Sequence, residues 1–417
     1  MRASAAVQLF YLALLAAAIT PAQAMELRTA VERAIAIDDQ RRALDSSRRA
    51  AEANAVADGA LPDPEIMIGA SGVPINDPLG ADGMTQYRIG MRQRFPAGDS
   101  RSLARERGES RAETLGARGA ARDLEVTHEV RQAWLAWVEA NQALELTIDS
   151  LETFEELVEL TEARYRSGSG RQSDVEQARL ELARLERRIL DAERQRDLAA
   201  SELARWTGQQ PVASPSPDLP DWPAPPEDRS IEAQLAAHPV IAADDSSIAT
   251  GRIEHELARQ AYRPSWALEG GYARQRGPSP SGGRMSDKFF AQVSLSLPLF
   301  PARRQDRRVD AARAEVDALE HQRSDRLREW RGQADAARVS YQRERERLGL
   351  IDASLLPQAE RTVDATLAAF RTDRADFDEL IRARLALLDE RIERVATESA
   401  LLKARARLAW LTAEEIS

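Results

Sequence analysis

The sequence is a duplication, and this feature limits the chain to folds in which every element occurs twice. A shift of 205 residues superposes short matches that lie far apart along the chain. Because these matches share one offset, apart from a one-residue slip before Tyr165, we expect two similar structural units. The shift pairs Phe95-Pro96 with Phe300-Pro301, Tyr165-Arg166 with Phe370-Arg371, Ala178-Arg179-Leu180 with Ala383-Arg384-Leu385, and Leu203-Ala204 with Leu408-Ala409.

The order of the patterns divides the chain into four segments. Residues 1–24 are predicted to be a secretory signal peptide, because Arg2 precedes an apolar run and Ala22-Gln23-Ala24 is typical of a cleavage site. A retained anchor is the alternative, although the apolar run of about 15 residues is short for spanning a bilayer. The first repeat covers residues 25–208, a proline-rich connector residues 209–230, and the second repeat residues 231–417. For the connector we expect an extended segment docked through Trp222, with a disordered linker as the alternative.

Composition excludes several classes of function. The chain has no cysteine, so disulfides, thiolate metal sites and a lipidated N-terminal cysteine are excluded. Its 58 basic and 68 acidic side chains give a formal net charge of −10, which argues against nucleic acid as a partner. No long apolar run follows the signal peptide, so any membrane crossing by the mature chain requires β-strands.

Helix dominates each repeat. A helix of moderate length is expected over residues 27–58 and 231–262, and a very long one over residues 100–164 and 304–369. After a short turn, a returning helix carries seam residues at spacings of 4 and 3, which predicts antiparallel coiled-coil hairpins. The seams are Ala178, Leu182, Leu185, Ile189, Ala192, Arg196, Ala199, Leu203 and Trp206 in the first repeat, and Ile381, Leu385, Leu388, Ile392, Val395, Ser399, Leu402, Ala406 and Ala409 in the second.

Two short alternating segments precede each long helix. In "FFAQVSLSLPLFP" (residues 289–301), apolar side chains alternate with Gln292, Ser294 and Ser296, so one face suits lipid and the other suits water. The length fits a transmembrane barrel strand, and a half-buried strand of a small soluble sheet is the alternative. Four strands cannot close a membrane barrel, so a lipid-exposed sheet needs other copies of the chain. The candidate membrane-strand residues are Tyr87, Ile89, Met91, Phe289, Val293, Leu295 and Leu297, and the candidates for an aromatic girdle are Tyr87, Trp266, Tyr272, Phe289 and Phe290.

The ordered set of patterns resembles the TolC-like outer-membrane efflux proteins. The resemblance covers the mature chain and rests on the duplication, the strand pairs ending in "RQRFPAGDSR" and "SLSLPLFPAR", the turns in "ARYRSGSGRQSD" and "AAFRTDRADFD", and the endings "LARWTG" and "LAWLTA". It implies a mainly α fold with a small β part, in which four strands per chain contribute to a trimeric 12-stranded barrel and the helices form a periplasmic tunnel. "LPDPEIMIG" and "MRQRFPAG" resemble the CzcC-like branch, which serves heavy-metal cation pumps.

The resemblance also assigns roles to the hairpin turns. They would meet the periplasmic adaptor of an efflux pump, through Tyr165, Arg166, Gly168, Gly170, Phe370, Arg371, Asp373 and Arg374. Next to them, Asp174, Asp378 and Glu379 would form acidic rings that gate the tunnel, whereas Arg382 replaces an expected carboxylate. The alternative is that these acids only favour helix N-termini.

No chemistry-bearing motif competes with this interpretation. The four histidines lack ligand spacing, although Glu254-His255-Glu256 superficially resembles a metal cluster, so we expect no resident metal and no cofactor. We find no nucleophile elbow or phosphate loop and predict that the chain is not an enzyme. The predicted function is a passive Gram-negative outer-membrane channel, working as a homotrimer with a periplasmic adaptor and an inner-membrane pump of the resistance-nodulation-division type. A periplasmic adaptor and a soluble coiled-coil scaffold are the alternatives.

Overall fold

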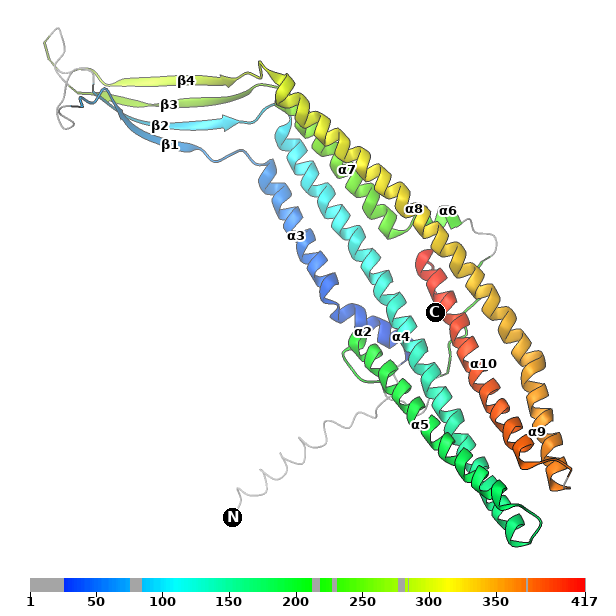
Figure 1. Cartoon of the computed structure of the whole chain (residues 1–417). Helices are drawn as coiled ribbons and strands as arrows, with labels where there is room; N and C mark the ends of the chain where they lie inside the picture. The colour runs from blue at the N-terminus through cyan, green and yellow to red at the C-terminus, as the bar shows by residue number, and fades with distance from the viewer. Residues whose placement is uncertain are drawn as a thin grey trace, which may run out of the picture. The chain divides into compact units, whose positions relative to one another are not determined.

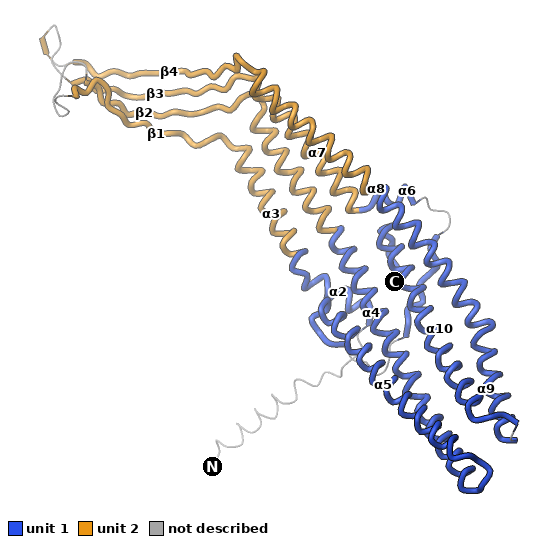
Figure 2. The backbone as a smooth tube through the Cα atoms, in the orientation of Figure 1, with its two compact units in different colours: residues 1–41, 121–238, 328–417 blue, residues 42–120, 239–327 orange. Residues whose placement is uncertain are grey.

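The computed structural model describes residues 26–75, 85–211, 218–226, 231–276, 282–283, 285–372 and 374–416. The predicted signal peptide lies outside the described residues. The chain forms two compact units (Figure 2): unit 1 comprises residues 1–41, 121–238 and 328–417, and unit 2 comprises residues 42–120 and 239–327. Each unit therefore takes segments from both repeats. Within the described ranges, no helix is long and apolar enough to cross a membrane.

The first helix of the first repeat is broken, whereas the sequence predicted one continuous helix. Helix α2 (Leu27–Ile37) and helix α3 (Asp39–Gly59) are separated by Asp38, whose backbone is extended. The Asp38 carboxylate accepts a hydrogen bond from the backbone N–H of Arg41 (2.6 Å) and pairs with Arg122 (2.8 Å). The break thus positions Asp38 to cap α3 and to join it to the long helix.

The corresponding helix of the second repeat is also broken. Helix α6 (Ile231–Ala236) ends two residues before helix α7 (Pro239–Arg259), and a 3-10 turn follows over Gln260–Tyr262. Pro239 disfavours a helical backbone at the residue before it and has no N–H to continue the ladder, which explains the interruption.

The long helices form the expected hairpins in unit 1 (Figure 1). Helix α4 (Ser100–Arg166) is continuous over 67 residues and returns as α5 (Gln172–Thr207), which Gly208 ends in a left-handed conformation. Every residue of the predicted α5 seam is buried or half-buried, including Arg196. The coiled-coil prediction for the first repeat is therefore confirmed by the packing.

The second long helix contains an irregularity that the sequence analysis missed. Helix α8 (Gln305–Leu350) is followed by a π-helical turn (Ile351–Leu355), helix α9 (Leu356–Arg371) and the returning helix α10 (Phe377–Leu411). Pro357 cannot donate to the carbonyl one turn earlier, and the wider π turn directly before it accommodates the missing bond. In the α10 seam, the hydroxyl of Ser399 donates to the carbonyl of Leu135 (3.3 Å), so this polar interruption is satisfied.

Unit 2 contains a single antiparallel sheet in the order β1-β2-β3-β4. Its strands are β1 (Glu65–Ser71), β2 (Gln86–Phe95), β3 (Ser265–Gln275) and β4 (Lys288–Ser296), as Figure 1 shows. The pairing of β2 with β3 joins the two repeats, since β1 and β2 come from the first and β3 and β4 from the second. The predicted strands are all present, but β4 ends earlier than expected.

A buried aromatic and histidine cluster lies in unit 1. The His128 ring stacks on Trp410 (centroids 4.8 Å apart), and a ring nitrogen of His238 lies 3.1 Å from the Trp410 carbonyl oxygen. Trp330 contacts both His238 and Trp410. The pKa of each histidine is lowered to about 4, mainly by burial and, for His128, also by the charge of Arg407. Both imidazoles are therefore neutral at pH 7. Trp134 and Trp137 are likewise core residues.

The described part of the connector is docked on unit 1. Trp222 is buried, with the Arg131 guanidinium 5.6 Å from its ring centroid. Arg405 donates to the carbonyl of Pro223 (2.8 Å) and pairs with Glu414 (2.9 Å). The Arg405 side chain is 1% exposed, so it links the connector to the C-terminal end from inside the core.

Candidate functional site

The sheet of unit 2 has one apolar and one charged face. Strand register places Ile68 opposite Ile89, Ile89 opposite Tyr272 and Tyr272 opposite Phe289, so these side chains share a face. We call this side the apolar face. Several of its side chains are largely exposed in one chain, with Ile68 at 81% and Phe289 at 88%. Its apolar members are Ile66, Ile68, Ala70, Tyr87, Ile89, Met91, Phe95, Trp266, Leu268, Tyr272, Phe289, Ala291, Val293 and Leu295.

The opposite side, the charged face, is held by ion pairs. Arg92 on β2 pairs with Glu269 on β3, and it lies 3.8 Å from Glu65 on β1. Arg94 also reaches Glu65, at 2.8 Å. Glu269 is 8% exposed, so its charge is neutralised by Arg92 close to the sheet surface. An array of carboxylates and guanidinium groups of this kind is suited to contact with water.

Phe290 is an aromatic residue on the charged face. Its ring covers two glycines, because a methyl group added at Gly90 or Gly271 would lie 3.1 or 2.8 Å from the ring edge. Gly271 also approaches the neighbouring strand so closely that a side-chain carbon would lie 2.3 Å from the Ile89 carbonyl oxygen. The glycines thus let the β2–β3 pair sit under the ring.

Most of the predicted membrane-strand residues lie on the apolar face, and one lies outside the strands. Tyr87, Ile89, Met91, Phe289, Val293 and Leu295 all belong to this face. Leu297 does not, because β4 ends at Ser296, and its placement in a strand is corrected. Pro298 has no N–H for a ladder, which explains the early end. Among the girdle candidates, Trp266 stacks on Phe95 with the ring centroids 3.9 Å apart, whereas Phe290 is on the charged face.

The two hairpin tips of unit 1 are joined by one side chain. Arg164, near the end of α4, donates from Nη1 to the carbonyl of Phe370 at the end of α9 (2.9 Å), and its guanidinium lies 4.6 Å from the Phe370 ring centroid. Phe370 is buried and also contacts Phe377 of α10. The Phe370 ring is thus inside the tip and is not available as a surface contact of this protomer.

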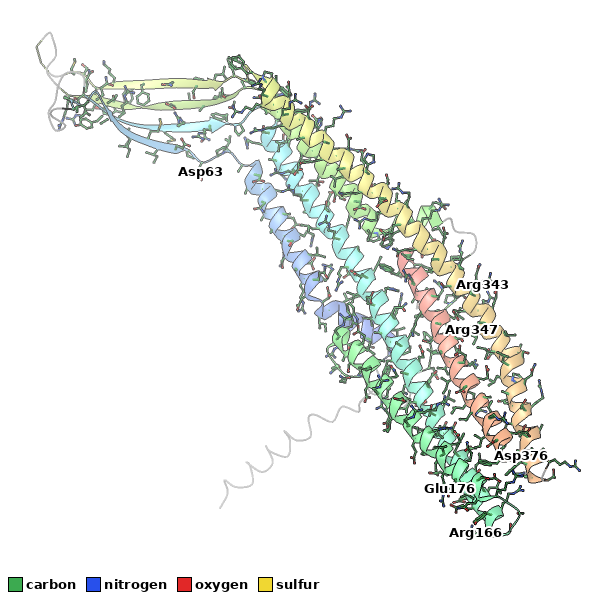
Figure 3. The ribbon with its side chains drawn as sticks, viewed as in Figure 1. Asp63, Arg166, Glu176, Arg343, Arg347 and Asp376 are labelled. Carbon is green, nitrogen blue, oxygen red and sulfur yellow. The ribbon has the colours of Figure 1, made fainter. Side chains whose placement is uncertain are left out.

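The first tip turns through the two predicted glycines. Gly168 has a φ of +79°, and Gly170 packs so closely that an added side-chain carbon would lie 3.0 Å from Cβ of Arg164. Both glycines are therefore required by the turn itself. Around them, Tyr165 and Arg166 are exposed, and Figure 3 shows Arg166 at the end of the hairpin. In the second tip Arg371 and Arg374 are exposed, and Asp373 lies outside the described residues.

The candidate gate residues lie in the first turns of the returning helices. Asp174 accepts a hydrogen bond from the backbone N–H of Arg171 (3.3 Å), which makes it part of a capping box. Asp378 and Glu379 are exposed in the first turn of α10, and Arg382 donates from Nε to the Asp378 carbonyl (3.1 Å). Helix capping accounts for Asp174, whereas the carboxylates of Asp378 and Glu379 are free to face solvent.

Sequence reasoning missed Arg164 and the charged face. Arg164 corresponds to Ala369 in the second repeat, so the duplication gave no signal for it. The ion pairs of Arg92 join strands of different repeats, and only the pairing of β2 with β3 brings them together. A signal was present in the alternation of Arg88, Arg92 and Arg94 with apolar residues in "YRIGMRQRF".

No metal site is found in the part of the chain that the structure describes: no three or more His, Asp and Glu side chains gather there to hold an ion. In the segment Glu254-His255-Glu256, Glu254 instead pairs with Arg111 (2.6 Å) and Glu256 with Arg259 (3.0 Å).

Comparison with known proteins relates the first repeat to a known family. Residues 30–209 match the family of outer membrane efflux proteins. The matched residues make up almost the whole first repeat, so the chain is similar to this family over that repeat. Comparison of the sequence with curated proteins gave no match. The match agrees with the predicted class, which is an outer-membrane efflux channel and not an enzyme. Members of the family form homotrimers that work with a periplasmic adaptor and an inner-membrane pump.

Solved outer-membrane channels share the fold of this chain. A structure of CusC matches with a TM-score of 0.80 at 15% identity, covering 93% of this chain and 92% of that one. VceC from Vibrio cholerae matches with a TM-score of 0.76 at 19% identity, covering 94% and 97%, and the open state of MtrE from Neisseria gonorrhoeae with a TM-score of 0.76 at 15% identity, covering 94% and 89%. The similarity thus extends over both repeats and confirms the predicted fold class.

Proposed function

We propose that three copies of this chain form a 12-stranded barrel with the apolar face toward lipid and the charged face toward the lumen. The observation that carries the proposal is the two-faced sheet. Side chains such as Ile68 and Phe289 leave an extensive apolar surface uncovered in one chain, and a surface of this kind is normally covered by lipid or protein. Strands β1 and β4 each pair on one side only, so their free edges can be completed by neighbouring copies.

The hairpin tips of unit 1 are proposed to dock the periplasmic adaptor. Support comes from the exposed side chains that surround a rigid core: Tyr165 and Arg166 on one tip, and Arg371 and Arg374 on the other. The Arg164–Phe370 contact holds both tips in one arrangement, which is the pre-organisation that a docking surface needs.

Asp378 and Glu379 are proposed to form the acidic rings of the tunnel entrance. Three-fold symmetry would turn each residue into a ring of three carboxylates, and such rings favour cations. Arg382 lies one turn along the same helix and reduces the local negative charge. We assign the gate to Asp378 and Glu379, because the carboxylate of Asp174 is engaged in capping.

The proposed cargo is heavy-metal cations, delivered by a pump of the resistance-nodulation-division type. This assignment rests on the resemblance of "LPDPEIMIG" and "MRQRFPAG" to the CzcC-like branch and on the exposed carboxylates at the tip. A passive channel needs no binding site of its own for such an ion.

The test begins with expression of the full chain in a Gram-negative host and fractionation of the envelope. The detergent-extracted protein should have the mass of three chains by light scattering corrected for detergent, and it should be recovered with the outer membrane. Recovery as a monomer in the soluble periplasm would overturn the channel. Zinc, cobalt and copper tolerance, measured with the adaptor and pump co-expressed, then tests the cargo; tolerance to organic drugs alone would contradict a metal cargo.

A further inference from the structure

We infer that four arginines at the start of α8 form a binding surface for anionic phospholipid. Arg303, Arg304, Arg307 and Arg308 are all exposed, and they come after the short segment that follows Ser296, the last residue of β4. In the described parts of the chain, Arg303, Arg304 and Arg308 make no ion pair, and Arg307 has only a surface pair with Asp310 (3.3 Å). We call these four residues the arginine cluster. Most of this positive charge is therefore not neutralised by an ion pair within the described residues.

The segment before the arginine cluster is apolar and uncovered. Leu297 is 54%, Leu299 70% and Phe300 88% exposed, although none of them lies in a strand. An apolar segment followed at once by a basic one matches the boundary between acyl chains and headgroups. Leu299 and Phe300 would enter the acyl region while the arginines reach phosphate.

The arginine cluster also lies at the correct end of the apolar face. Ser296, the last residue of β4, pairs with Ser265, the first residue of β3. At this end the apolar face finishes with Trp266 stacked on Phe95 (3.9 Å), an aromatic pair of the kind found at membrane interfaces. Toward this end of the sheet, the apolar side chains are followed by the aromatic pair and then by the arginine cluster. This order matches the change from the acyl chains to the headgroups of a bilayer.

The duplication provides an internal comparison. Helices α4 and α8 begin at equivalent positions, Ser100 and Gln305, and the residues equivalent to the arginine cluster are Gly98, Asp99, Ser102 and Leu103. The first repeat builds the same strand-to-helix junction without a single one of these charges, so the fold does not require them. A guanidinium group binds phosphate through two parallel hydrogen bonds, which makes the phosphate of an anionic lipid the ligand that this charge fits.

The experiment measures lipid retention on the full-length protein in detergent by native mass spectrometry. Phosphatidylglycerol and phosphatidylcholine with identical acyl chains are added at equal concentration. Each basic residue near an anionic surface is worth about fivefold in affinity. We therefore expect clear preference for phosphatidylglycerol, and a loss of at least about tenfold in the variant with Arg303, Arg304, Arg307 and Arg308 changed to Gln.

A matched control replaces four exposed arginines of unit 1 by Gln: Arg194, Arg343, Arg345 and Arg361. Arg343 carries an i, i+3 surface pair with Glu346, as Arg307 does with Asp310, so the two sets lose the same charge and the same kind of contact. The control should keep the preference for phosphatidylglycerol. Phe300→Ser should lower retention of both lipids alike, because it removes only the apolar contact.

Four outcomes would overturn the inference. The first two are equal retention of the two lipids by the unchanged protein, and an equal loss of phosphatidylglycerol retention in the cluster and control variants. The third is displacement of phosphatidylglycerol by inorganic phosphate at the same concentration. The fourth is dissociation of the trimer in the cluster variant, which would make the cluster a subunit contact. The inference rests on the proposed placement of the sheet in the membrane. Failure of that placement is recognised separately, because the protein would then retain neither lipid and stay soluble without detergent.

Discussion

The guanidinium of Arg164 lies 4.6 Å from the centre of the Phe370 ring and donates to the carbonyl of the same residue at 2.9 Å. One side chain of the first repeat thus contacts both the ring and the backbone carbonyl of a residue in the second repeat. The contact lies next to the exposed residues that are proposed to bind the adaptor. Binding of the adaptor should therefore depend on how well this contact orders the tip.

Arg164→Ala should loosen the tips without unfolding the hairpins. Loss of a cation–π contact and a charged hydrogen bond costs about 1–3 kcal/mol locally. Amide hydrogen exchange at residues 368–378 should therefore become faster, and adaptor affinity should fall. Arg166→Ala, which removes an exposed neighbour, is the control for exchange. Unchanged exchange in Arg164→Ala would show that Phe370 is held by its own core contacts.

Asp378→Asn with Glu379→Gln should reduce cation selectivity. If the carboxylates form rings at the entrance, their removal lowers the negative potential there. The measurement is the reversal potential of single trimers in a planar bilayer under a salt gradient. Asp335→Asn, an exposed change on α8, should leave selectivity intact. Equal reversal potentials in the unchanged protein, the double variant and the control would contradict the gate. The two carboxylates would then only stabilise the N-terminus of their helix.

Gly271→Ala should destabilise the sheet far more than Gly69→Ala. An alanine at position 271 would bring a methyl carbon within 2.3 Å of the Ile89 carbonyl oxygen and 2.6 Å of Gly90 Cα, whereas position 69 has nothing within 4 Å. Overpacking against backbone costs about 1–3 kcal/mol, so the Gly271 variant should form less folded trimer and unfold at lower temperature. Similar unfolding temperatures for the two variants would contradict the close approach of β2 and β3.

Stability should decrease as the pH falls from about 6.5 to about 4. The pKa of His128 and of His238 is about 4 in the fold, below the ordinary value of about 6.5, so between these values the unfolded chain binds more protons than the folded one. The contribution of each histidine to the free energy of unfolding is fully present above about pH 6.5. It is lost as the pH falls toward about 4, and it amounts to on the order of 1–3 kcal/mol for each histidine. His128→Gln with His238→Gln should flatten the dependence of the unfolding midpoint on pH in this range. His321→Gln, at an exposed histidine, should retain it, and a steep dependence in the double variant would assign the effect to other groups.

Arg405→Met should release the connector. The change leaves Glu414 without its guanidinium partner and the Pro223 carbonyl without its donor, which costs about 3–5 kcal/mol for a broken buried pair. Limited proteolysis should then cut within residues 209–230 at lower protease concentration. Arg407→Met, at an exposed position on the same helix, serves as the control. Equal cleavage of both variants would show that Trp222 alone holds the connector.

The sequence by itself determined the duplication, the paired hairpins and the four alternating strands. These features are local or periodic: heptad spacing predicts a helix seam wherever the partner lies, and alternation predicts a two-faced strand before its neighbours are known. Gly168 and Gly170 were also correctly placed in a turn, because only local backbone geometry requires them. The breaks at Asp38 and before Pro239 have local causes too, although one continuous helix was expected for each segment.

Only the tertiary structure decided which side chains meet across the repeats. Arg92 finds Glu269, Arg164 finds Phe370, and Arg405 finds the connector through contacts between segments 177, 206 and 182 residues apart. No spacing in the chain encodes such contacts, because they depend on strand register and on how four long helices pack together. The same holds for the arginine cluster: the sequence shows its charges, but only the register of β3 and β4 shows that the chain leaves the sheet toward them at the end of the apolar face that carries Trp266 and Phe95.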